Sequence, residues 1–537
     1  MNSPILDMTQ RPTNAPRQDS FMRSCVIGGA FLVAEIMTLI GLALYILAGA
    51  NRVPFHGDES TILYTTRDMS YLLNNQMEHI SYSDAPETIS STAATEQDLR
   101  LLNGTVARYV YGFFAMHPKT RQPFEPINEQ WDWGAGWGYN LETGRLPTTL
   151  QLNRARLLSS LLLVGAMLSL YGLTRRIGGP IAALIAAAYF TLNPALLLNG
   201  RRAMMESSWL LFGLLSLYIA VGMCWRIQGT WPIPFGNHRR ALRSVPLSGY
   251  VFLGGTLGLA LASKHTALFY VAAVFGAVLF APLLAKRRLW RIHAVGVPLM
   301  ITVLIGMFLA LNPAWWSDPI RRLGEVMHLR SVLLAGQSET FGGYASTGER
   351  LAGLLRQGFI VPAQYYEVAN WKELIGAQIA AYEQSGLQGV SIGGSVAGAL
   401  VVIGLVAVGV MACVRALINP DSVMVRPAEP EQTNFKIGRK EIVARSASEG
   451  IELERAAQAD VDAAVPTPLP AMGAWVALWL GLAGLAAAVT TPLEWQRYYL
   501  PLYPAIAVFL GVGVMVIVRA VAKQRQGAVR QTPTDSL

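Results

Sequence analysis

Residues 392–414 read IGGSVAGALVVIGLVAVGVMACV, a stretch that contains no Asp, Glu, Lys or Arg. A helix needs roughly 20 predominantly apolar residues to cross the hydrocarbon core of a bilayer. This stretch meets that requirement over its whole length. The sequence therefore predicts a membrane-spanning helix here.

The same rule predicts nine further spans along the chain. Together the ten predicted spans are 25–50, 155–173, 180–198, 207–225, 249–263, 265–284, 292–311, 392–414, 471–491 and 498–518. The fifth is short and rich in glycine, and it joins the sixth through a tight turn at Ser263-Lys264-His265. We expect an all-α fold, a polytopic transmembrane helical bundle of about 10–11 spans.

The composition agrees with a membrane protein. Of the 537 residues, 52% are hydrophobic and only 14% are charged, whereas about a quarter of the residues of a soluble domain are charged. This excludes disorder, a nucleic-acid-binding module and a disulfide scaffold for the chain as a whole. Cys25, Cys224 and Cys413 lie in or beside apolar runs without a C-x-x-C partner, so they are interpreted as packing residues.

The basic residues predict the orientation in the membrane. Short connections such as Arg175-Arg176 and Lys286-Arg287-Arg288 are expected in the cytoplasm, because cytoplasmic loops are enriched in Lys and Arg. Both termini are then cytoplasmic, and two long loops, 51–154 and 312–391, face outward. Each contains a stretch with helical apolar spacing, typical of a helix in the membrane interface.

These features define the expected organisation of the chain. Residues 415–470 are rich in Ala, Glu, Arg and Pro and are expected to be flexible. The predicted parts are a cytoplasmic N-terminal tail (1–24), a transmembrane core with both outer loops (25–414), a flexible cytoplasmic loop (415–470), the last two transmembrane helices (471–518) and a cytoplasmic tail (519–537).

Four polar clusters lie near the predicted outer ends of spans. They are His56-Gly57-Asp58-Glu59, the segment from Gly200 to Glu206 with Arg201 and Arg202, Ser263-Lys264-His265, and the segment from Glu494 to Pro501 with Arg497 and Tyr498. Each alone has a plain explanation: a hydrated loop, an interfacial Arg–Glu pair, a snorkelling lysine or an aromatic belt. Their convergence on one membrane face instead predicts a polar, cationic pocket at the lipid boundary.

Taken together, the clusters resemble the motifs of polyprenyl-phosphate-sugar-dependent glycosyltransferases of the GT-C fold. The similarity is to the superfamily of dolichyl-phosphate-mannose protein mannosyltransferases and the lipid A aminoarabinose transferase. The matching segments are Asp58-Glu59, Gly200 to Glu206, Ser263 to Leu268 and Arg497 to Pro504. They occur in the family's order over roughly residues 25–520. Glu206 replaces the more usual Asp, and His265 stands where an aromatic residue is common.

The resemblance implies an enzyme that transfers a sugar, with mannose the first guess, from a polyprenyl or dolichyl monophosphate. The acceptor is a hydroxyl of a protein Ser or Thr, a glycolipid or an envelope polymer on the extracytoplasmic face, and the anomeric centre is inverted. The implied catalytic residues are Asp58, as the base, and Glu59. The implied substrate-binding residues are His56, Arg201, Arg202, Glu206, Lys264, His265, Arg497 and Tyr498, with Arg201, Lys264 and Arg497 on the phosphate.

The resemblance requires no cofactor, and a divalent metal held by His56 and Asp58 stays an open alternative. The expected partners are the lipid-linked donor, a lipid, protein or glycan acceptor, and membrane lipids, but no nucleic acid. The expected location is the cell (inner) membrane of a prokaryote. The rival functions are a secondary transporter, which binds substrate near the midplane, and a lipid-linked-sugar flippase or ligase.

Overall fold

The computed structural model describes residues 15–82, 91–227, 247–280, 290–367, 371–418 and 472–530. In these ranges the regular structure is helical, and the described residues contain no strand beyond one isolated bridge between Met116 and Pro123. The flexible loop expected at 415–470 lies outside the described residues from position 419 on. The same is true of residues 1–14 and 531–537 in the two expected tails.

Seven of the described helices are long and apolar enough to cross a membrane. They are α1 (Ala15–Ala48), α7 (Thr149–Gly178), α10 (Glu206–Ile227), α14 (Trp290–Leu311), α18 (Val396–Ile418), α20 (Gly473–Thr490) and α21 (Tyr503–Arg530). Two shorter apolar helices, α12 (Leu247–Ser263) and α13 (Leu268–Phe280), and one bent pair occupy the other predicted positions. The all-α membrane bundle is confirmed, although length alone qualifies seven or eight helices as spans, not 10–11.

The bent pair is α8 (Pro180–Leu192) and α9 (Pro194–Arg201), which meet at 63°. The sequence predicted one straight span at 180–198. Proline cannot continue a helix, because it lacks the N–H and its ring clashes with the preceding turn. Asn193 begins a new helix instead, since its side-chain oxygen accepts a hydrogen bond from the backbone N–H of Leu196 at 3.1 Å. The bend turns the chain before Arg201 and Arg202.

Small residues allow close packing inside the bundle. A Cβ atom at Gly254 of α12 would lie 2.4 Å from the carbonyl oxygen of Met300, and one at Gly258 would lie 2.8 Å from that of Leu304. Both carbonyls belong to α14. The spacing Gly254-x-x-x-Gly258 therefore brings the two backbones into direct contact, as small residues do between membrane helices.

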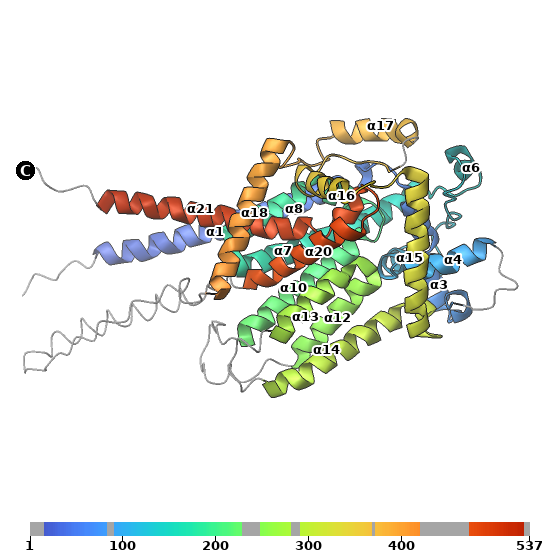
Figure 1. The fold of residues 1–537 in the computed structure, drawn as a ribbon, viewed down its shortest axis with the longest axis horizontal. Coiled ribbons are helices and arrows are strands. Elements are labelled where there is room, and N and C mark those ends of the chain that lie inside the picture. Colours follow the sequence, from blue (N-terminus) through green and yellow to red (C-terminus); the bar gives the residue numbers. More distant parts are fainter. Residues whose placement is uncertain are drawn as a thin grey trace, which may run out of the picture.

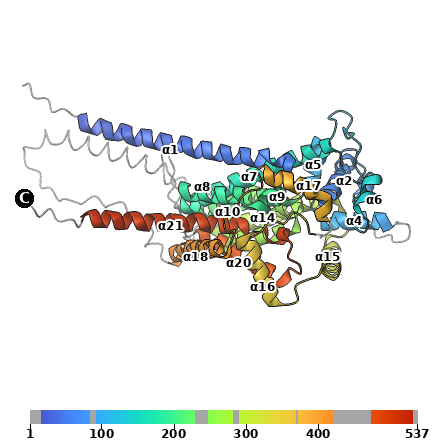
Figure 2. The ribbon, with the colours of Figure 1, turned by 90° about the horizontal axis from the view of Figure 1, so that it is seen from above.

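The two long loops form a helical cap on one end of the bundle. The first contains α2 (Gly57–Tyr64), α3 (Arg67–Leu73), α4 (Ser91–Leu102), α5 (Val106–Phe114) and α6 (Trp137–Glu142), and the second contains α15 (Pro319–Phe341), α16 (Thr347–Leu355) and α17 (Trp371–Gln384). Figure 1 shows α3, α4, α6 and α15 at the same end of the molecule. The start of α1 and the end of α21 extend from the opposite end (Figures 1 and 2).

The two loops pack against each other. Phe55 and Trp131 of the first loop share a buried cluster with Trp371 and Ile375 of the second. The backbone N–H of Phe55 also donates to Gln378 Oε1 at 2.8 Å. This interface places the residues that follow α1 beside α17.

Amphipathic helices lie at the junction of cap and bundle. In α15 the side chains of Ile320, Leu323 and Met327 are exposed, whereas those of Arg322 and Val326 are buried. Figure 1 shows α15 crossing the ends of the spanning helices at a steep angle. An exposed apolar face in that position is typical of a helix that lies in the membrane interface.

Candidate active site

The site is built around the N-terminus of α2. The Nδ1 atom of His56 accepts a hydrogen bond from the backbone N–H of Asp58 at 3.1 Å, and the Glu59 carboxylate accepts one from the backbone N–H of His56 at 3.1 Å. This reciprocal capping box fixes the start of the helix. Because Nδ1 accepts, the ring proton is placed on Nε2, which donates to Glu367 Oε2 at 2.6 Å.

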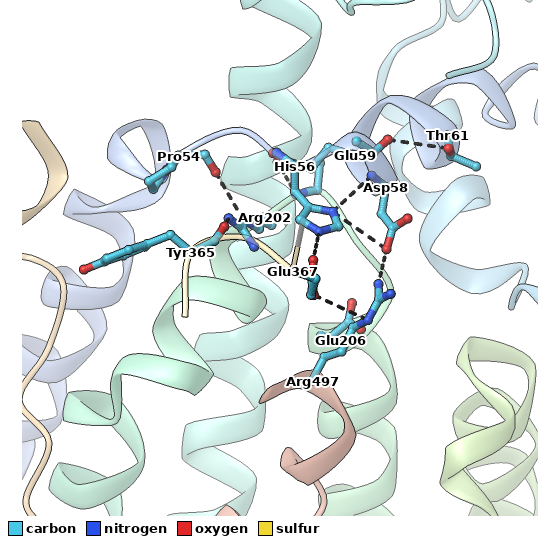
Figure 3. A network of polar contacts seen from close by, with 12 residues as sticks. Pro54, His56, Asp58, Glu59, Thr61, Arg202, Glu206, Tyr365, Glu367 and Arg497 are labelled. Carbon is cyan, nitrogen blue, oxygen red and sulfur yellow. Dashed lines mark hydrogen bonds and ion pairs between the residues drawn. The ribbon is translucent and has the colours of Figure 1, made fainter. Parts of the chain in front are cut away.

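Arg497 joins the two carboxylates on either side of His56. Its Nη1 atom donates to Asp58 Oδ2, and its Nε atom lies 3.6 Å from Glu367 Oε1. Figure 3 shows Asp58, Glu367 and Arg497 converging on His56. Asp58 Oδ1 accepts no hydrogen bond from a described residue, and the side chain is 29% exposed. One carboxylate oxygen of Asp58 is therefore open to a substrate.

The surrounding charges hold both carboxylates in the ionised form. Burial would raise the pKa of Asp58, but the guanidinium of Arg497 and the His56 side chain together outweigh burial and hold that pKa below its ordinary value of 3.8. Burial also opposes ionisation of Glu367, yet the His56 and Arg497 side chains hold its pKa well below the usual range. An ionised Asp58 with a free oxygen can accept a hydrogen bond and a proton from an approaching hydroxyl.

Glu59, predicted beside Asp58 as a catalytic residue, points the other way into the protein. It is fully buried, and Arg156 of α7 donates to both of its oxygens at 2.8 and 2.7 Å. The backbone N–H of Ala203 donates to the same carboxylate at 2.8 Å. Glu59 thus connects α2, α7 and the end of α9, which is the environment of a positioning residue.

Replacing Glu59 with Ala should therefore lower the free energy of unfolding strongly. Removing one partner of a buried ion pair typically costs about 3–5 kcal/mol, because the other charge stays buried without compensation. Thermal unfolding of the detergent-solubilised protein measures the effect, and Glu373→Ala on the exposed face of α17 is the matched control. A thermally stable Glu59→Ala protein that has lost turnover would instead return Glu59 to the chemistry.

Arg201 and Arg202 both use their donors within the protein. Arg201 is fully buried and donates to the carbonyl oxygens of Tyr45, Ile46 and Leu387 and to the hydroxyl of Tyr382. Arg202, also buried, donates to the carbonyl oxygens of Pro54 at 3.1 Å and Tyr365 at 2.7 Å. The arginines join α1, α9 and the second loop. In the structure Arg201 joins these segments, and the phosphate-binding role expected of it stays a prediction.

The remaining predicted residues are Glu206, Lys264, Tyr498 and His265. Glu206 Oε1 accepts from Lys264 Nζ at 2.6 Å, and its other oxygen is buried without a partner among the described residues. Tyr498 stacks on Trp495 and donates to Gln337 Oε1 at 3.2 Å. His265 packs edge-on against Trp315. Lys264 and Arg497 thus remain candidate cations for an anionic substrate.

Arg330 of α15 adds a cation that the sequence motifs did not indicate. Its side chain is exposed and forms no ion pair or hydrogen bond with any residue that the structure describes. It lies close enough to Arg497, Tyr498 and His265 to act electrostatically on each. Arg330 has no carboxylate partner among the described residues, and Arg497 is near it. Such a pair of arginines is suited to bind an anion.

Three further residues of the site were missed from the sequence: Glu367, Arg156 and Arg330. Glu367 had no recognisable motif and lies 311 positions from its partner His56. Arg156 offered a weak signal, an arginine inside the predicted span 155–173, where a charge must be paired or face water. In the described residues, no group of three or more His, Cys, Asp or Glu side chains converges as a metal site would.

Comparisons with known proteins give this geometry a family context. The model of the family described as dolichyl-phosphate-mannose-protein mannosyltransferase matches residues 139–317, about a third of the chain. Residues 139–317 resemble this family, as the motifs led us to expect. The matched segment includes Arg201, Glu206 and Lys264, whereas Asp58 and Arg497 lie outside it. A comparison with curated proteins finds no match.

Solved structures give distant likenesses. The archaeal oligosaccharyltransferase AglB from Archaeoglobus fulgidus, in complex with an inhibitory peptide and a dolichol-phosphate, is 13% identical with a TM-score of 0.42; the comparison covers 94% of this chain and 52% of that one. ArnT from Cupriavidus metallidurans, bound to undecaprenyl phosphate, is 15% identical with a TM-score of 0.33, covering 94% and 81%. The chain thus spans about half the length of the oligosaccharyltransferase.

Proposed function

We propose that this protein is a membrane glycosyltransferase that uses a polyprenyl monophosphate sugar as donor and an acceptor hydroxyl on the extracytoplasmic face. One observation carries the proposal: Arg497 contacts the candidate base Asp58 and acts electrostatically on Arg330, while Glu206, which Figure 3 shows beside Arg497, accepts a hydrogen bond from Lys264. Arg497 therefore belongs both to the neighbourhood of the proton acceptor Asp58 and to the proposed anion site. The family match over residues 139–317 supports the same reaction class, with mannose as the first sugar to test.

The proposed reaction balances in a single displacement. Asp58 Oδ1 takes the proton of the acceptor hydroxyl while the hydroxyl oxygen forms a bond to the anomeric carbon. The bond between that carbon and the phosphate oxygen breaks, and the polyprenyl phosphate leaves with the electron pair. Lys264, Arg330 and the unpaired Nη2 of Arg497 stabilise the developing negative charge, which is where fixed cations accelerate a reaction most. Attack opposite the leaving group inverts the anomeric centre.

The amphipathic helix α15 suits a donor that is half lipid. Its exposed Ile320, Leu323 and Met327 face the surroundings at the junction of cap and bundle, and the same helix carries Arg330. A donor whose polyprenyl chain lies in the membrane can place its phosphate beside Arg330 without leaving the lipid. The acceptor then approaches from the cap side, where Asp58 is exposed.

The rival transporter function has one structural feature in its favour, the break between α8 and α9. Transporters bind substrates at such breaks, where backbone groups are free. Here the freed carbonyl of Leu192 accepts a hydrogen bond from the backbone N–H of Val390 at 2.7 Å, and Asn193 caps the following helix. The backbone groups at the break thus already have hydrogen-bond partners within the protein, which favours an enzyme over a transporter.

A transfer assay tests the proposal. Purified protein receives radiolabelled polyprenyl-monophosphate sugars, and transfer to an acceptor or to water is measured. Right-side-out vesicles with a membrane-impermeant acceptor test the face. Transfer in both formats is expected, and a diphosphate-linked donor is included for the flippase and ligase alternatives. Solute-driven uptake into proteoliposomes without any sugar transfer would overturn the proposal in favour of a transporter.

The donor site itself can be tested at Arg330. Replacing Arg330 with Ala should weaken binding of the polyprenyl-monophosphate donor by about 10–100-fold, since a hydrogen bond to a charged group contributes about 1.5–3 kcal/mol. The matched control is Arg321→Ala, which removes the same charge from the same helix about 13 Å away along its axis. Donor affinity is measured by titration in nanodiscs. Equal affinities in the two variants would exclude Arg330 from the phosphate site.

A further inference from the structure

Five aromatic rings from both outer loops form a continuous cluster next to His56. They are Phe55, Trp131, Trp133, Trp137 and Trp371, with ring centroids 5.5–6.4 Å apart. Four of them are buried or half-buried, but Trp133 is 49% exposed. The cluster therefore presents one large, open aromatic side chain beside the candidate base.

Trp133 touches the backbone that carries Asp58. A Cβ atom placed on Gly57 would lie 2.7 Å from Cη2 and 2.8 Å from Cζ2 of the Trp133 ring, so a side chain at position 57 would collide with the indole. The Trp133 and His56 rings are 5.9 Å apart. Trp133 thus packs directly against the segment that carries the candidate base Asp58.

The Trp133 indole is supported by a neighbouring ring and still leaves about half of its surface exposed. Trp371 stacks on it with a centroid distance of 5.7 Å and an interplanar angle of 12°. Trp133 nevertheless keeps 49% of its surface exposed. A supported indole with this exposure offers a flat apolar surface to a ligand.

The loop that carries Trp133 is held rigidly. The buried side chain of Asn140 accepts from the backbone N–H of Asp132 at 2.8 Å and donates to the carbonyl oxygens of Asp132 at 3.0 Å and Gly136 at 3.1 Å. Binding on such a surface costs little ordering of the protein, which is the benefit of preorganisation.

Asp132, the residue that precedes Trp133, offers a hydrogen-bond acceptor. Asp132 Oδ1 accepts from the backbone N–H of Gly134 at 2.9 Å, while Oδ2 has no partner among the described residues. A pyranose ring has an apolar face of C–H groups and a rim of hydroxyl donors. A flat indole with an adjacent carboxylate matches both features of a sugar ring, whereas an extended peptide offers no comparable flat face.

We propose that Trp133 and Asp132 form an acceptor subsite for a sugar ring, so that the acceptor is a carbohydrate and not the Ser or Thr hydroxyl of a peptide. The inference rests on the proposed glycosyltransferase function and specifies its substrate. Figures 1 and 2 show α6, which follows this loop, farther from the bundle than the interfacial helix α15. We expect the acceptor to arrive at this end of the cap.

The test compares three acceptors with wild-type protein and variants of this loop. The acceptors are a soluble oligosaccharide, a glycolipid with the same terminal sugar and a Ser/Thr-containing peptide. Trp133→Ala should raise the KM for the carbohydrate acceptor by about tenfold, the size expected for loss of one aromatic stacking contact. The rate of donor hydrolysis by water should fall far less than the rate of transfer to the carbohydrate, and Trp133→Phe should restore part of the acceptor affinity.

The control is Tyr139→Ala, an equally exposed aromatic of α6 that contacts Arg145 and is not one of the five clustered rings. Its acceptor KM should equal that of the wild type. The difference in tryptophan fluorescence between wild type and Trp133→Phe should respond to the oligosaccharide without any turnover. An unchanged KM in Trp133→Ala, or transfer to the peptide alone, would overturn the subsite. Absence of both transfer and donor hydrolysis in the wild type would instead overturn the proposed function.

Discussion

Replacing Asp58 with Asn should lower turnover by about 10²–10⁴-fold, the usual contribution of a general base. Asparagine has nearly the same volume, and its side-chain carbonyl oxygen can still accept a hydrogen bond from Arg497. It cannot take the proton of the acceptor hydroxyl. Donor affinity should be retained or slightly increased, because Arg497 loses a neutralising carboxylate and becomes more attractive to the phosphate. Single-turnover rates and donor titrations on the same preparation measure the two effects.

The matched control for Asp58→Asn is Glu373→Gln, which removes a carboxylate charge from the exposed surface of the same cap. It should leave turnover and donor affinity unchanged, since most surface substitutions have effects within about 0.5 kcal/mol. Near-wild-type turnover in Asp58→Asn would remove Asp58 from the mechanism. Glu367 would then be the next candidate, because Glu59 is fully buried against Arg156.

The sequence predicted the spans well because the physical requirement for a span is local. Roughly 20 apolar residues are visible in any window of the chain, and every predicted span coincides with described helices. The bend between α8 and α9 was missed even though Asn193-Pro194 is a local signal for a helix start. The apolar composition of 180–198 continues through that signal, so the run was interpreted as one helix.

The sequence indicated candidate site residues that lie within a short motif. It missed their partners that lie in distant segments of the chain. Asp58, Lys264 and Arg497 could be found because each lies in a short polar segment beside a predicted span. Glu367 could not, because a carboxylate in a long loop is ordinarily solvated surface. Its role follows only from the fold, which brings the second loop over His56.

Arg201 shows what a local sequence pattern cannot distinguish. Two adjacent arginines near lipid suggested phosphate binding, since the guanidinium suits bidentate contact with phosphate. A guanidinium suits buried carbonyl oxygens equally well, and these come from Tyr45 and Ile46 at the end of α1 and from Leu387 in the second loop. No local pattern distinguishes an arginine that binds ligand from one that joins three distant segments.

Replacing Arg497 with Met should combine a large loss of rate with a shift in pH dependence. Removing one group that stabilises developing charge costs about 10²–10³-fold in turnover. In addition, Asp58 loses one of the two neighbours, Arg497 and His56, that together outweigh its burial. The pKa of Asp58 should therefore rise, because burial disfavours the ionised carboxylate and a neighbouring arginine favours it.

The sign of the pH effect follows from which form of Asp58 is active. In the wild type the pKa of Asp58 lies below 3.8, so the ionised base persists and kcat/KM should show no acid limb from Asp58 above that pH. In Arg497→Met the acid limb should move to higher pH, because the raised pKa leaves more of the base protonated at a given pH. The stability that the Asp58–Arg497 pair provides is present above the unfolded-state pKa and lost as pH falls through the folded-state pKa.

Arg497→Lys is the control that separates charge from shape. It keeps a positive charge beside Asp58 but loses the planar guanidinium that also contacts Glu367, so its turnover should fall while its acid limb stays where the wild type has it. The measurement is kcat/KM for the donor between pH 4 and 8, a range in which a phosphodiester keeps a constant charge. An acid limb in Arg497→Met identical to that of the wild type would show that Arg497 does not set the ionisation of the base. We propose that Arg497 both keeps Asp58 ionised and binds the leaving phosphate. That result would contradict the proposal, and the two functions would have to belong to different residues.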